Sequence, residues 1–277
     1  MNRLTLIDII NRALQEDLAS GDITSEAIFE TDFQVRANFV AKSSGVLAGF
    51  PVAAAVFEQL DPKVIYYSKV PEGNRVAPGD IIGEVTGPIR AILGGERVAL
   101  NFLQRLSGIA TQTANLVRLI EGYPARITDT RKTTPGLRQL EKYAVRQGGG
   151  FNHRFNLADA VLIKDNHIAA CGSIREAVAR ARLHSPHTMR IEVEVENETQ
   201  VREALEAKAD IIMLDNMACD EMTRMVKLIN HRALVEASGN INENTIKSVA
   251  ATGVDLISVG AITHSVKALD ISLKIYS

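Results

Sequence analysis

The sequence contains little of what several classes of protein require. Only two of its 277 residues are cysteines, and neither Cys171 nor Cys219 stands in a CxxC pair or beside other metal ligands. A disulfide framework and a zinc site are therefore not expected, and the composition suits a reducing cytoplasm. The formal net charge is −2, so the chain also lacks the overall positive charge typical of proteins that bind nucleic acids.

Long apolar runs are absent too. The longest weakly polar stretch, residues 46–57, is interrupted by Gly49 and Pro51 and is too short to span a bilayer. The amino-terminal residues form no long apolar core, so we expect neither a signal peptide nor a membrane partner. The hydrophobic fraction is an ordinary 46%, and the chain is long enough for one or two domains with a real core.

The first third of the sequence mixes helical and strand-like patterns. Apolar residues at helical spacing predict an amphipathic helix over residues 4–18, and the polar segment DLASGDITSEA at 17–27 predicts a turn. Alternating apolar and polar residues over 34–42 predict a half-buried strand, which favours an α+β domain with an antiparallel sheet open on one face. The further elements expected here are a helix at 52–60 and strands at 63–70 and 81–86.

A long helical pattern covers residues 91–121 and is expected to link two domains, with Gly108 predicting a break within it. We place an N-terminal domain at residues 1–110 and a second domain at 111–267. The apolar segment 271–276 can pack back on the first domain, so residues 268–277 are assigned to that domain.

From residue 125 onward, short apolar runs alternate with helical patterns. This order predicts a parallel sheet with right-handed crossovers. Six strands are too few for the standard eight-stranded barrel, and the pattern alone also allows an open doubly wound sheet. The strands are expected at 125–128, 160–163, 190–195, 211–214, 234–237 and 256–259, with helices between them, for example at 174–183 and 221–229.

Charged clusters gather near the ends of these predicted strands. They lie at residues 129–132, 152–154 and 164–167. Side chains at the carboxyl ends of parallel strands face the ligand crevice of α/β folds, so Arg131, Lys132 and Lys164 should face one pocket. Arg grips carboxylate and phosphate in a planar fork and Lys acts as a point charge, so such a pocket suits a small polyanion.

The third predicted strand carries three glutamates, Glu192, Glu194 and Glu196, alternating with apolar residues. If its apolar face packs under helices, the glutamates enter the barrel and need cationic partners such as Lys164 or Arg131. The alternative is an edge strand with a solvated glutamate face.

Glycines follow the last two predicted strands, in Ser238-Gly239-Asn240 and Val259-Gly260-Ala261. Glycine lets the backbone approach a ligand closely, and barrels commonly bind phosphate at these loops. Two ordinary glycine turns are the alternative.

The motifs TDTRKTTPGLR, GGGFNHR and LIKDNH, in this order between residues 128 and 167, resemble those of the nicotinate-nucleotide pyrophosphorylase family, the decarboxylating quinolinate phosphoribosyltransferases. The resemblance implies an incomplete, about six-stranded α/β barrel with an N-terminal α+β open sandwich domain. It also implies transfer of phosphoribosyl from phosphoribosyl pyrophosphate to quinolinate with loss of CO2, in a cytoplasmic homodimer that uses Mg²⁺ and no organic cofactor.

The resemblance also assigns residues to the substrates. Quinolinate is expected at Arg131, His153, Arg154 and Lys164, with Arg97 reaching the site from a partner chain; from composition alone, Arg97 is equally well a solvated helix charge. Lys132 and Lys164 would neutralise pyrophosphate. Glu194 and Asp215 would hold ribose hydroxyls directly or through Mg²⁺. The remaining expected substrate-binding residues are Thr130, Ser238, Gly239, Asn240, Val259, Gly260 and Ala261, and His167 is expected to be a loop or supporting residue.

Three alternatives remain open at this point. One is a sister enzyme acting on another base, or a related protein encoded with molybdate transporters. Another is a carrier module, because residues 72–87 resemble the turn of biotinyl and lipoyl domains, although Lys63 and Lys69 do not sit at a hairpin tip. The third is a non-catalytic barrel that binds a phosphosugar.

Overall fold

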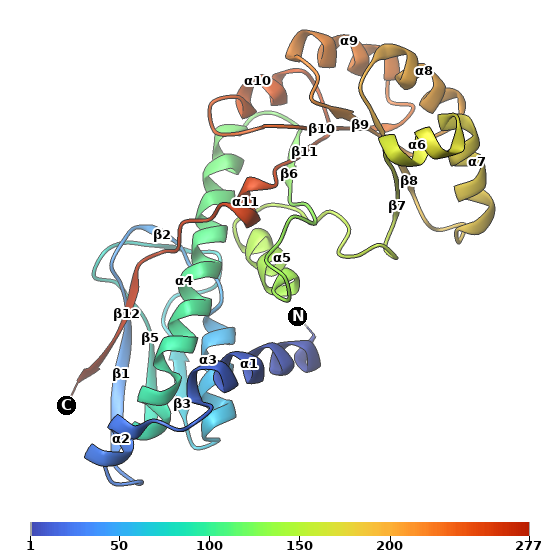
Figure 1. Ribbon diagram of the computed structural model, residues 1–277. Coiled ribbons are helices and arrows are strands. Elements are labelled where there is room, and N and C mark those ends of the chain that lie inside the picture. Colours follow the sequence, from blue (N-terminus) through green and yellow to red (C-terminus); the bar gives the residue numbers. More distant parts are fainter. Residues whose placement is uncertain (1, 277) are drawn as a thin grey trace. The chain divides into compact units, whose positions relative to one another are not determined.

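The computed structural model describes residues 2–276 and divides into two compact units (Figure 1). The first unit contains the chain up to Ala114, together with Thr133–Gly149 and the residues from Ile262 onward. The second contains Asn115–Lys132 and Gly150–Ala261. No helix within residues 2–276 combines the length and the apolar character needed to cross a membrane.

A four-stranded antiparallel sheet forms the centre of the first unit, in the order β12-β1-β5-β3. Burial alternates along β1, and its buried Phe39 packs against Phe50 and Phe57 of α3, with ring centroids 5.6 and 6.2 Å apart. All four residues of β3 are exposed, so this edge of the sheet stays open. The strands are β1 (Gln34–Ala41), β3 (Ile65–Ser68), β5 (Ile81–Pro88) and β12 (Ile271–Tyr276); β2 (Gly45–Val46) pairs with β4 (Arg75–Val76).

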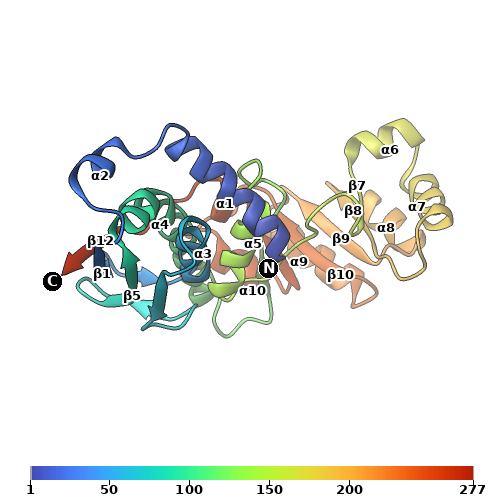
Figure 2. The ribbon, with the colours of Figure 1, turned by 90° about the horizontal axis from the view of Figure 1, so that it is seen from below.

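The last strand, β12, pairs antiparallel with β1, from Arg36 opposite Tyr276 to Ala41 opposite Ile271. The two strands lie side by side in both views (Figures 1 and 2). The expected return of segment 271–276 to the amino-terminal sheet is therefore confirmed.

Three helices of the first unit lie within its N-terminal part. The predicted helix at 4–18 is confirmed as α1 (Arg3–Leu18), whose first turn is capped by Asn2. The predicted turn at 17–27 contains a short helix, α2 (Ile23–Ile28), because the Asp22 carboxylate accepts the backbone N–H of Ser25. Glu72 caps α3 (Phe50–Leu60) by accepting the backbone N–H groups of Gly49 and Phe50.

Helix α4 (Ile89–Leu119) is continuous, so the predicted break at Gly108 is wrong. A Cβ at position 108 would lie only 2.3 Å from the carbonyl oxygen of Lys267. Glycine is present because another segment crosses the helix closely, and not because the helix ends there. The buried Glu141 of α5 (Arg138–Gln147) accepts from Arg105 of α4 at 2.6 Å and from the Thr134 backbone N–H at 3.1 Å.

The second unit is an incomplete parallel barrel. Its sheet runs in the order β6-β11-β10-β9-β8-β7. Strands β7 to β11 are thus neighbours in chain order, and β6 adjoins β11, which is barrel order without the reversal of a doubly wound sheet. Within the described residues no ladder joins β6 to β7, so the barrel is open there. The strands are β6 (Arg126–Thr128), β7 (Val161–Ile163), β8 (Ile191–Val195), β9 (Ile211–Asp215), β10 (Leu234–Ser238) and β11 (Leu256–Ser258).

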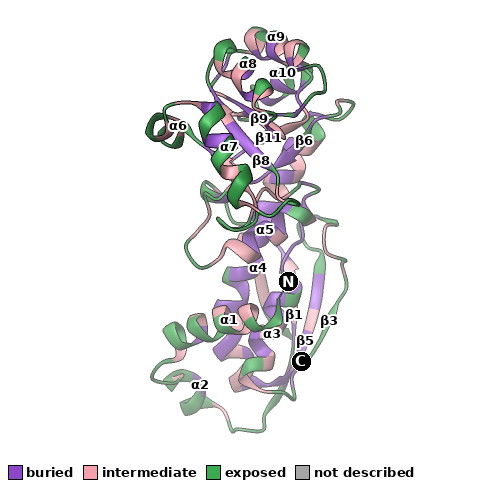
Figure 3. Cartoon of the chain, turned by 90° about the vertical axis from the view of Figure 1, so that its right-hand side faces the viewer, coloured by how far each residue is buried: buried purple, intermediate pink, exposed green. Residues whose placement is uncertain are grey.

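Helices between the strands cover the outside of the barrel (Figure 1), and buried residues concentrate on the strands (Figure 3). All six predicted strands are confirmed to within two residues at either end. The helices are α6 (Asp165–Cys171), α7 (Ile174–His184), α8 (Glu198–Glu206), α9 (Cys219–Ile229) and α10 (Ile246–Ala251), followed by α11 (Ala261–His264) after β11.

The loop between α5 and β7 bridges the opening of the barrel. Phe151 donates its backbone N–H to Ile127 of β6 at 2.8 Å and accepts from the Asp129 N–H at 3.1 Å. Further along, the Arg154 guanidinium donates to the carbonyl of Ala160, just before β7, at 2.9 Å. The segment that carries the GGGFNHR motif is therefore fixed to both edges of the open sheet.

Candidate active site

The carboxyl ends of the barrel strands carry nearly all the predicted site residues. Thr130, Arg131 and Lys132 follow β6, and Lys164 follows β7 directly. The remaining residues lie at or after the ends of β8 to β11, or on the loop that bridges the opening. These are His153, Arg154, Glu194, Asp215, Ser238, Gly239, Asn240, Val259, Gly260 and Ala261.

The expected pairing of a lysine with the glutamate strand is confirmed for Lys164 and Glu194. Lys164 Nζ lies 2.5 Å from Glu194 Oε2, and the side chains are 46% and 15% exposed, so the pair stays open to a ligand. His167 supports this lysine, because its Nδ1 accepts the Lys164 backbone N–H at 3.0 Å at the start of α6. Its expected supporting role thus has a geometric basis.

Arg154 stands in a partly buried, cationic environment. Burial lowers the pKa of its guanidinium, and the charge of Arg131 lowers that pKa further, while Glu192 and Asp159 act in the opposite direction. The effect of Arg131 on Arg154 indicates that the two guanidinium groups share one neighbourhood. Two close positive charges repel each other, so a dianion between them would relieve the repulsion.

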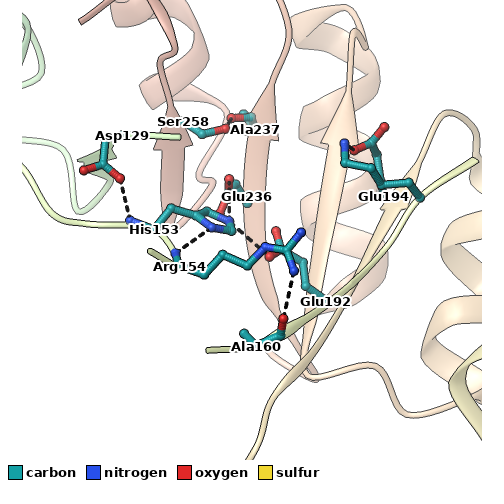
Figure 4. Close-up of polar contacts among 10 residues, drawn as sticks. Asp129, His153, Arg154, Ala160, Glu192, Glu194, Glu236, Ala237 and Ser258 are labelled. Atoms are coloured by element: carbon teal, nitrogen blue, oxygen red, sulfur yellow. Dashed lines mark hydrogen bonds and ion pairs between the residues drawn. The ribbon is translucent and has the colours of Figure 1, made fainter. Parts of the chain in front are cut away.

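His153 is held by buried carboxylates on three sides (Figure 4). Its backbone N–H donates to Asp129 at 2.9 Å. Its ring Nε2 lies 3.1 Å from Glu192 Oε2 and 3.6 Å from Glu236 Oε1. Its Nδ1 accepts the backbone N–H of Arg154 at 2.8 Å. The imidazole is thus fixed through both of its nitrogens.

Glu192 and Glu236 are not among the residues that the sequence assigned to the substrates, although Glu192 was expected to enter the barrel if the apolar face of its strand packed under helices. Strand β8 lies between β7 and β9, and Glu192 is only 2% exposed, so the alternative of a solvated edge strand is wrong. Glu236 is 1% exposed. The pKa of Glu236 is raised to about 7, chiefly by burial and next by the charge of Glu192, against the lowering effect of His153. The signal for Glu236 in the sequence was a single glutamate within the otherwise apolar start of β10.

Among the described residues, one group of potential metal-ligand atoms lies within 4.8 Å, and it consists of His153, Glu192 and Glu236. It does not include Glu194 or Asp215, the carboxylates predicted to hold Mg²⁺. Those two stand at the ends of neighbouring strands and offer oxygen atoms, the donor type that Mg²⁺ prefers. They therefore fit a magnesium ion bound mainly through a phosphorylated substrate.

The glycine loop after β10 has a structural requirement of its own. Gly239 adopts φ +103°, and a Cβ there would lie 2.2 Å from Asn216 Oδ1. Asn240 donates to that same oxygen at 3.3 Å, and Asn216 donates its side-chain amide to Asp215 at 2.8 Å. The loops after β9 and β10 therefore form one hydrogen-bonded rim.

Arg97 lies in the other unit, exposed on α4, where its charge lowers the pKa of the neighbouring Glu96 against the larger opposing effect of burial. Its expected contribution to a site in a partner chain stays a prediction.

A parallel α/β barrel with arginines, lysines and carboxylates around one rim defines an anion-binding barrel protein of the kind that handles phosphorylated substrates. The sequence matches the family described as quinolinate phosphoribosyl transferase, through its N-terminal domain over residues 22–107 and its C-terminal domain over 109–274. The chain belongs to the quinolinate phosphoribosyltransferase family.

Relatives match along almost the whole chain. One is the probable nicotinate-nucleotide pyrophosphorylase (carboxylating) of Bacillus subtilis, 49% identical over 275 residues, covering 99% of this chain and 95% of the relative. Another is the mitochondrial quinolinate phosphoribosyltransferase (decarboxylating) 2 of Nicotiana glauca, 43% identical, with 98% and 82% covered. The crystal structure of NadC from Streptococcus pyogenes has a TM-score of 0.95 at 44% identity, with 100% and 99% covered.

Proposed function

We propose that this chain transfers phosphoribosyl from phosphoribosyl pyrophosphate to quinolinate, giving nicotinate mononucleotide, pyrophosphate and CO2 in NAD biosynthesis. Membership of the quinolinate phosphoribosyltransferase family along the whole chain supports this activity and leaves the carrier alternative without support. The structural observation that carries it is the cluster of cations at the carboxyl ends of the barrel strands, where Lys164 pairs with Glu194 at 2.5 Å and the charge of Arg131 acts on the guanidinium of Arg154. Quinolinate has two adjacent carboxylates, which match two such cations.

Quinolinate is assigned to Arg131, His153, Arg154 and Lys164. The arginines grip its carboxylates, and orientation is the main contribution of these residues, because the ring nitrogen must face the ribose carbon that it attacks. Lys164 is suited to act at the boundary of the two substrates, since it is exposed and can exchange its contact with Glu194 for a ligand anion.

Phosphoribosyl pyrophosphate is assigned to the rest of the rim. Lys132 and Lys164 neutralise the pyrophosphate, Glu194 and Asp215 hold the ribose hydroxyls, and the loops after β10 and β11 hold the terminal phosphate, with Thr130 beside them. Carboxylates beside the ribose also stabilise the positive charge that develops on it. Mg²⁺, when bound with this substrate, supplies further neutralisation of the pyrophosphate.

The reaction needs no organic cofactor. The pyridine nitrogen forms a bond to ribose C1 while the bond from C1 to pyrophosphate breaks, and the leaving oxygen keeps the electron pair. The ring is then cationic, so the carboxylate beside the nitrogen can leave as CO2 while the ring carbon keeps the electrons and takes up a proton. The residues of the chain act by holding and neutralising charge.

A homodimer completes the proposal, with Arg97 of each chain reaching quinolinate in the other. The exposed position of Arg97 on α4, outside the unit that holds the strand ends, supports this arrangement. Both cysteines are free thiols, which is compatible with a cytoplasmic location.

The decisive experiment incubates the protein with phosphoribosyl pyrophosphate, Mg²⁺ and either quinolinate or nicotinate, and measures nucleotide and CO2. We expect nucleotide and CO2 in equal amounts when the acid is quinolinate, and neither product when it is nicotinate. Nucleotide formed from nicotinate and not from quinolinate would instead identify a sister enzyme, and no nucleotide from either acid would favour a non-catalytic barrel.

A further inference from the structure

The contacts of His153 fix which of its nitrogens carries a proton. The backbone N–H of Arg154 donates to Nδ1 at 2.8 Å, so Nδ1 must present its lone pair. The proton of the neutral ring is therefore on Nε2, which faces the Glu192 carboxylate at 3.1 Å and the Glu236 carboxylate at 3.6 Å. The ring is a link between two buried carboxylates and the backbone of Arg154.

The two carboxylates come from separate strands, β8 and β10, yet both reach the same imidazole nitrogen inside the barrel (Figure 4). Oε1 of each is buried without a hydrogen-bond partner. An incompletely satisfied buried carboxylate destabilises the fold, so ordinary packing gives no reason for placing two of them together.

The position of Arg154 is set more by the contacts of His153 than by the hydrogen bonds of its own guanidinium. Its guanidinium donates to the Ala160 carbonyl through Nη1, while its buried Nε has no hydrogen-bond partner. Its backbone position is set on one side by His153 Nδ1, and the preceding residues are held by Asp129, which accepts from Asn152 Nδ2 at 2.6 Å. Rotation of the imidazole would therefore release the Arg154 backbone.

We propose that Glu192 and Glu236 are positioning residues of the quinolinate subsite: they lock the imidazole of His153, and His153 in turn fixes Arg154 for the quinolinate carboxylates. The inference rests on the proposed function, because it assigns a role within that substrate's subsite. Neither glutamate needs to touch a substrate. Their effect should therefore fall on quinolinate and not on phosphoribosyl pyrophosphate.

The test compares Glu192→Gln with the wild type and with Asp255→Asn. Asp255 is the control, since its carboxylate accepts the backbone N–H of Val235 at 2.8 Å and it lies before β11, at the amino-terminal ends of the strands and not at the carboxyl ends that carry the predicted site residues. We expect Glu192→Gln to raise the KM for quinolinate roughly tenfold, as when one charge-assisted hydrogen bond is weakened. The dissociation constant for phosphoribosyl pyrophosphate, measured by calorimetry, should stay within about twofold.

A double-mutant cycle then separates positioning from general stabilisation. In the Arg154→Ala background, Glu192→Gln should change the KM for quinolinate by less than about twofold, because the residue through which it acts is gone. The same factor in both backgrounds, or an unchanged quinolinate KM in Glu192→Gln alone, would overturn the inference. If Glu192→Gln fails to fold, Glu236→Gln enters the same cycle.

Two further results have defined meanings. If the wild type forms no nucleotide from quinolinate, the proposed function fails, whereas an active wild type with an unaffected Glu192→Gln rejects only the positioning role. A stoichiometric metal ion in the purified wild type that is lost in Glu236→Gln would overturn the inference in favour of a metal site at His153, Glu192 and Glu236.

Discussion

At the scale of single residues, the site is a balance between clustered cations and carboxylates that are buried to different depths. Burial and the charge of Arg131 lower the pKa of Arg154, while Glu192 and Glu236 are kept out of water nearby. Glu194, by contrast, is partly exposed and already paired with Lys164. Depth of burial thus separates carboxylates that support the site from those that can meet a ligand.

Arg154→Ala should mainly weaken quinolinate binding. Loss of one charged hydrogen-bonding partner is expected to reduce the binding free energy on the order of 2–3 kcal/mol, with phosphoribosyl pyrophosphate still bound. Calorimetric titration of each substrate measures this. Arg175→Ala, which removes an exposed arginine paired with Glu206 on the outside of the barrel, is the control and should leave both affinities unchanged. An unchanged quinolinate dissociation constant in Arg154→Ala would remove Arg154 from the quinolinate subsite.

Glu194→Gln should reduce turnover by roughly a hundredfold while leaving quinolinate affinity nearly unchanged. The amide keeps the shape of the side chain but loses the negative charge that faces the developing ribosyl cation. Steady-state kinetics with both substrates varied, together with calorimetry, separates the two effects. Near-normal turnover combined with weaker quinolinate binding would assign Glu194 to a different subsite.

Glu236 should make stability depend on pH. Its pKa is raised from 4.5 to about 7 in the folded protein, so between these values the folded state holds a proton that the unfolded state has lost. This contribution to stability is complete below about pH 4.5 and is lost as the pH rises through about 7. Gln at this position resembles the neutral acid at every pH.

The measurement is the melting temperature of the wild type minus that of Glu236→Gln, followed from pH 5 to 8 by circular dichroism. This difference should fall as the pH rises across that range. A constant difference would show that Glu236 does not change its protonation on folding in this window.

At the scale of secondary-structure elements, the sequence predicted the β/α alternation well. Buried parallel strands are short apolar runs, and such runs can be recognised without knowing how the strands pair. It also predicted Glu194 near a strand end, because the bounds of the strand at 190–195 could be read from the sequence. The pairing of Glu192 and Glu236 could not be predicted, since it depends on two non-adjacent strands whose side chains meet across the barrel interior. Only the curvature of the sheet, together with the loop that bridges its opening, brings them to one imidazole.

Gly108 illustrates the same limit. Its low helix propensity predicts a break, yet α4 continues through it because the segment at Lys267 passes too close for any side chain. A close approach between residues far apart in the sequence leaves no local signal other than the glycine itself.

Two glycines of α4 should therefore respond oppositely to alanine. Gly94→Ala meets only Leu18 at 3.7 Å, an ordinary contact, and should stabilise the protein by about 0.5–1 kcal/mol through helix propensity. Gly108→Ala gains the same propensity but forces a Cβ within 2.3 Å of the Lys267 carbonyl oxygen, so it should destabilise the protein. Melting temperatures followed by circular dichroism compare the two. Stabilisation by both substitutions would show that the segment at 266–268 is not held against the helix.

At the scale of the whole molecule, we predict that the active site is built from two chains. Arg97 lies on α4 in the unit that does not hold the strand ends, whereas Lys164 stands at a strand end. A two-fold symmetric dimer would contain two equivalent sites, each with the Arg97 of the partner chain. Complementation between two inactive variants tests this arrangement directly.

Arg97→Ala and Lys164→Ala are each expected to be nearly inactive alone. In a mixed dimer, one site combines an intact Lys164 with an intact Arg97 donated by the other chain, while the second site carries both substitutions. Random exchange of equal amounts of the two variants makes half of the dimers mixed, so about a quarter of all sites should recover full activity. If Arg97 acted within its own chain, every site in the mixture would still carry one substitution. No recovery after exchange has been verified by mass spectrometry of intact dimers would therefore reject the shared site, while the assignment of the phosphoribosyl transfer to the barrel rim would stand.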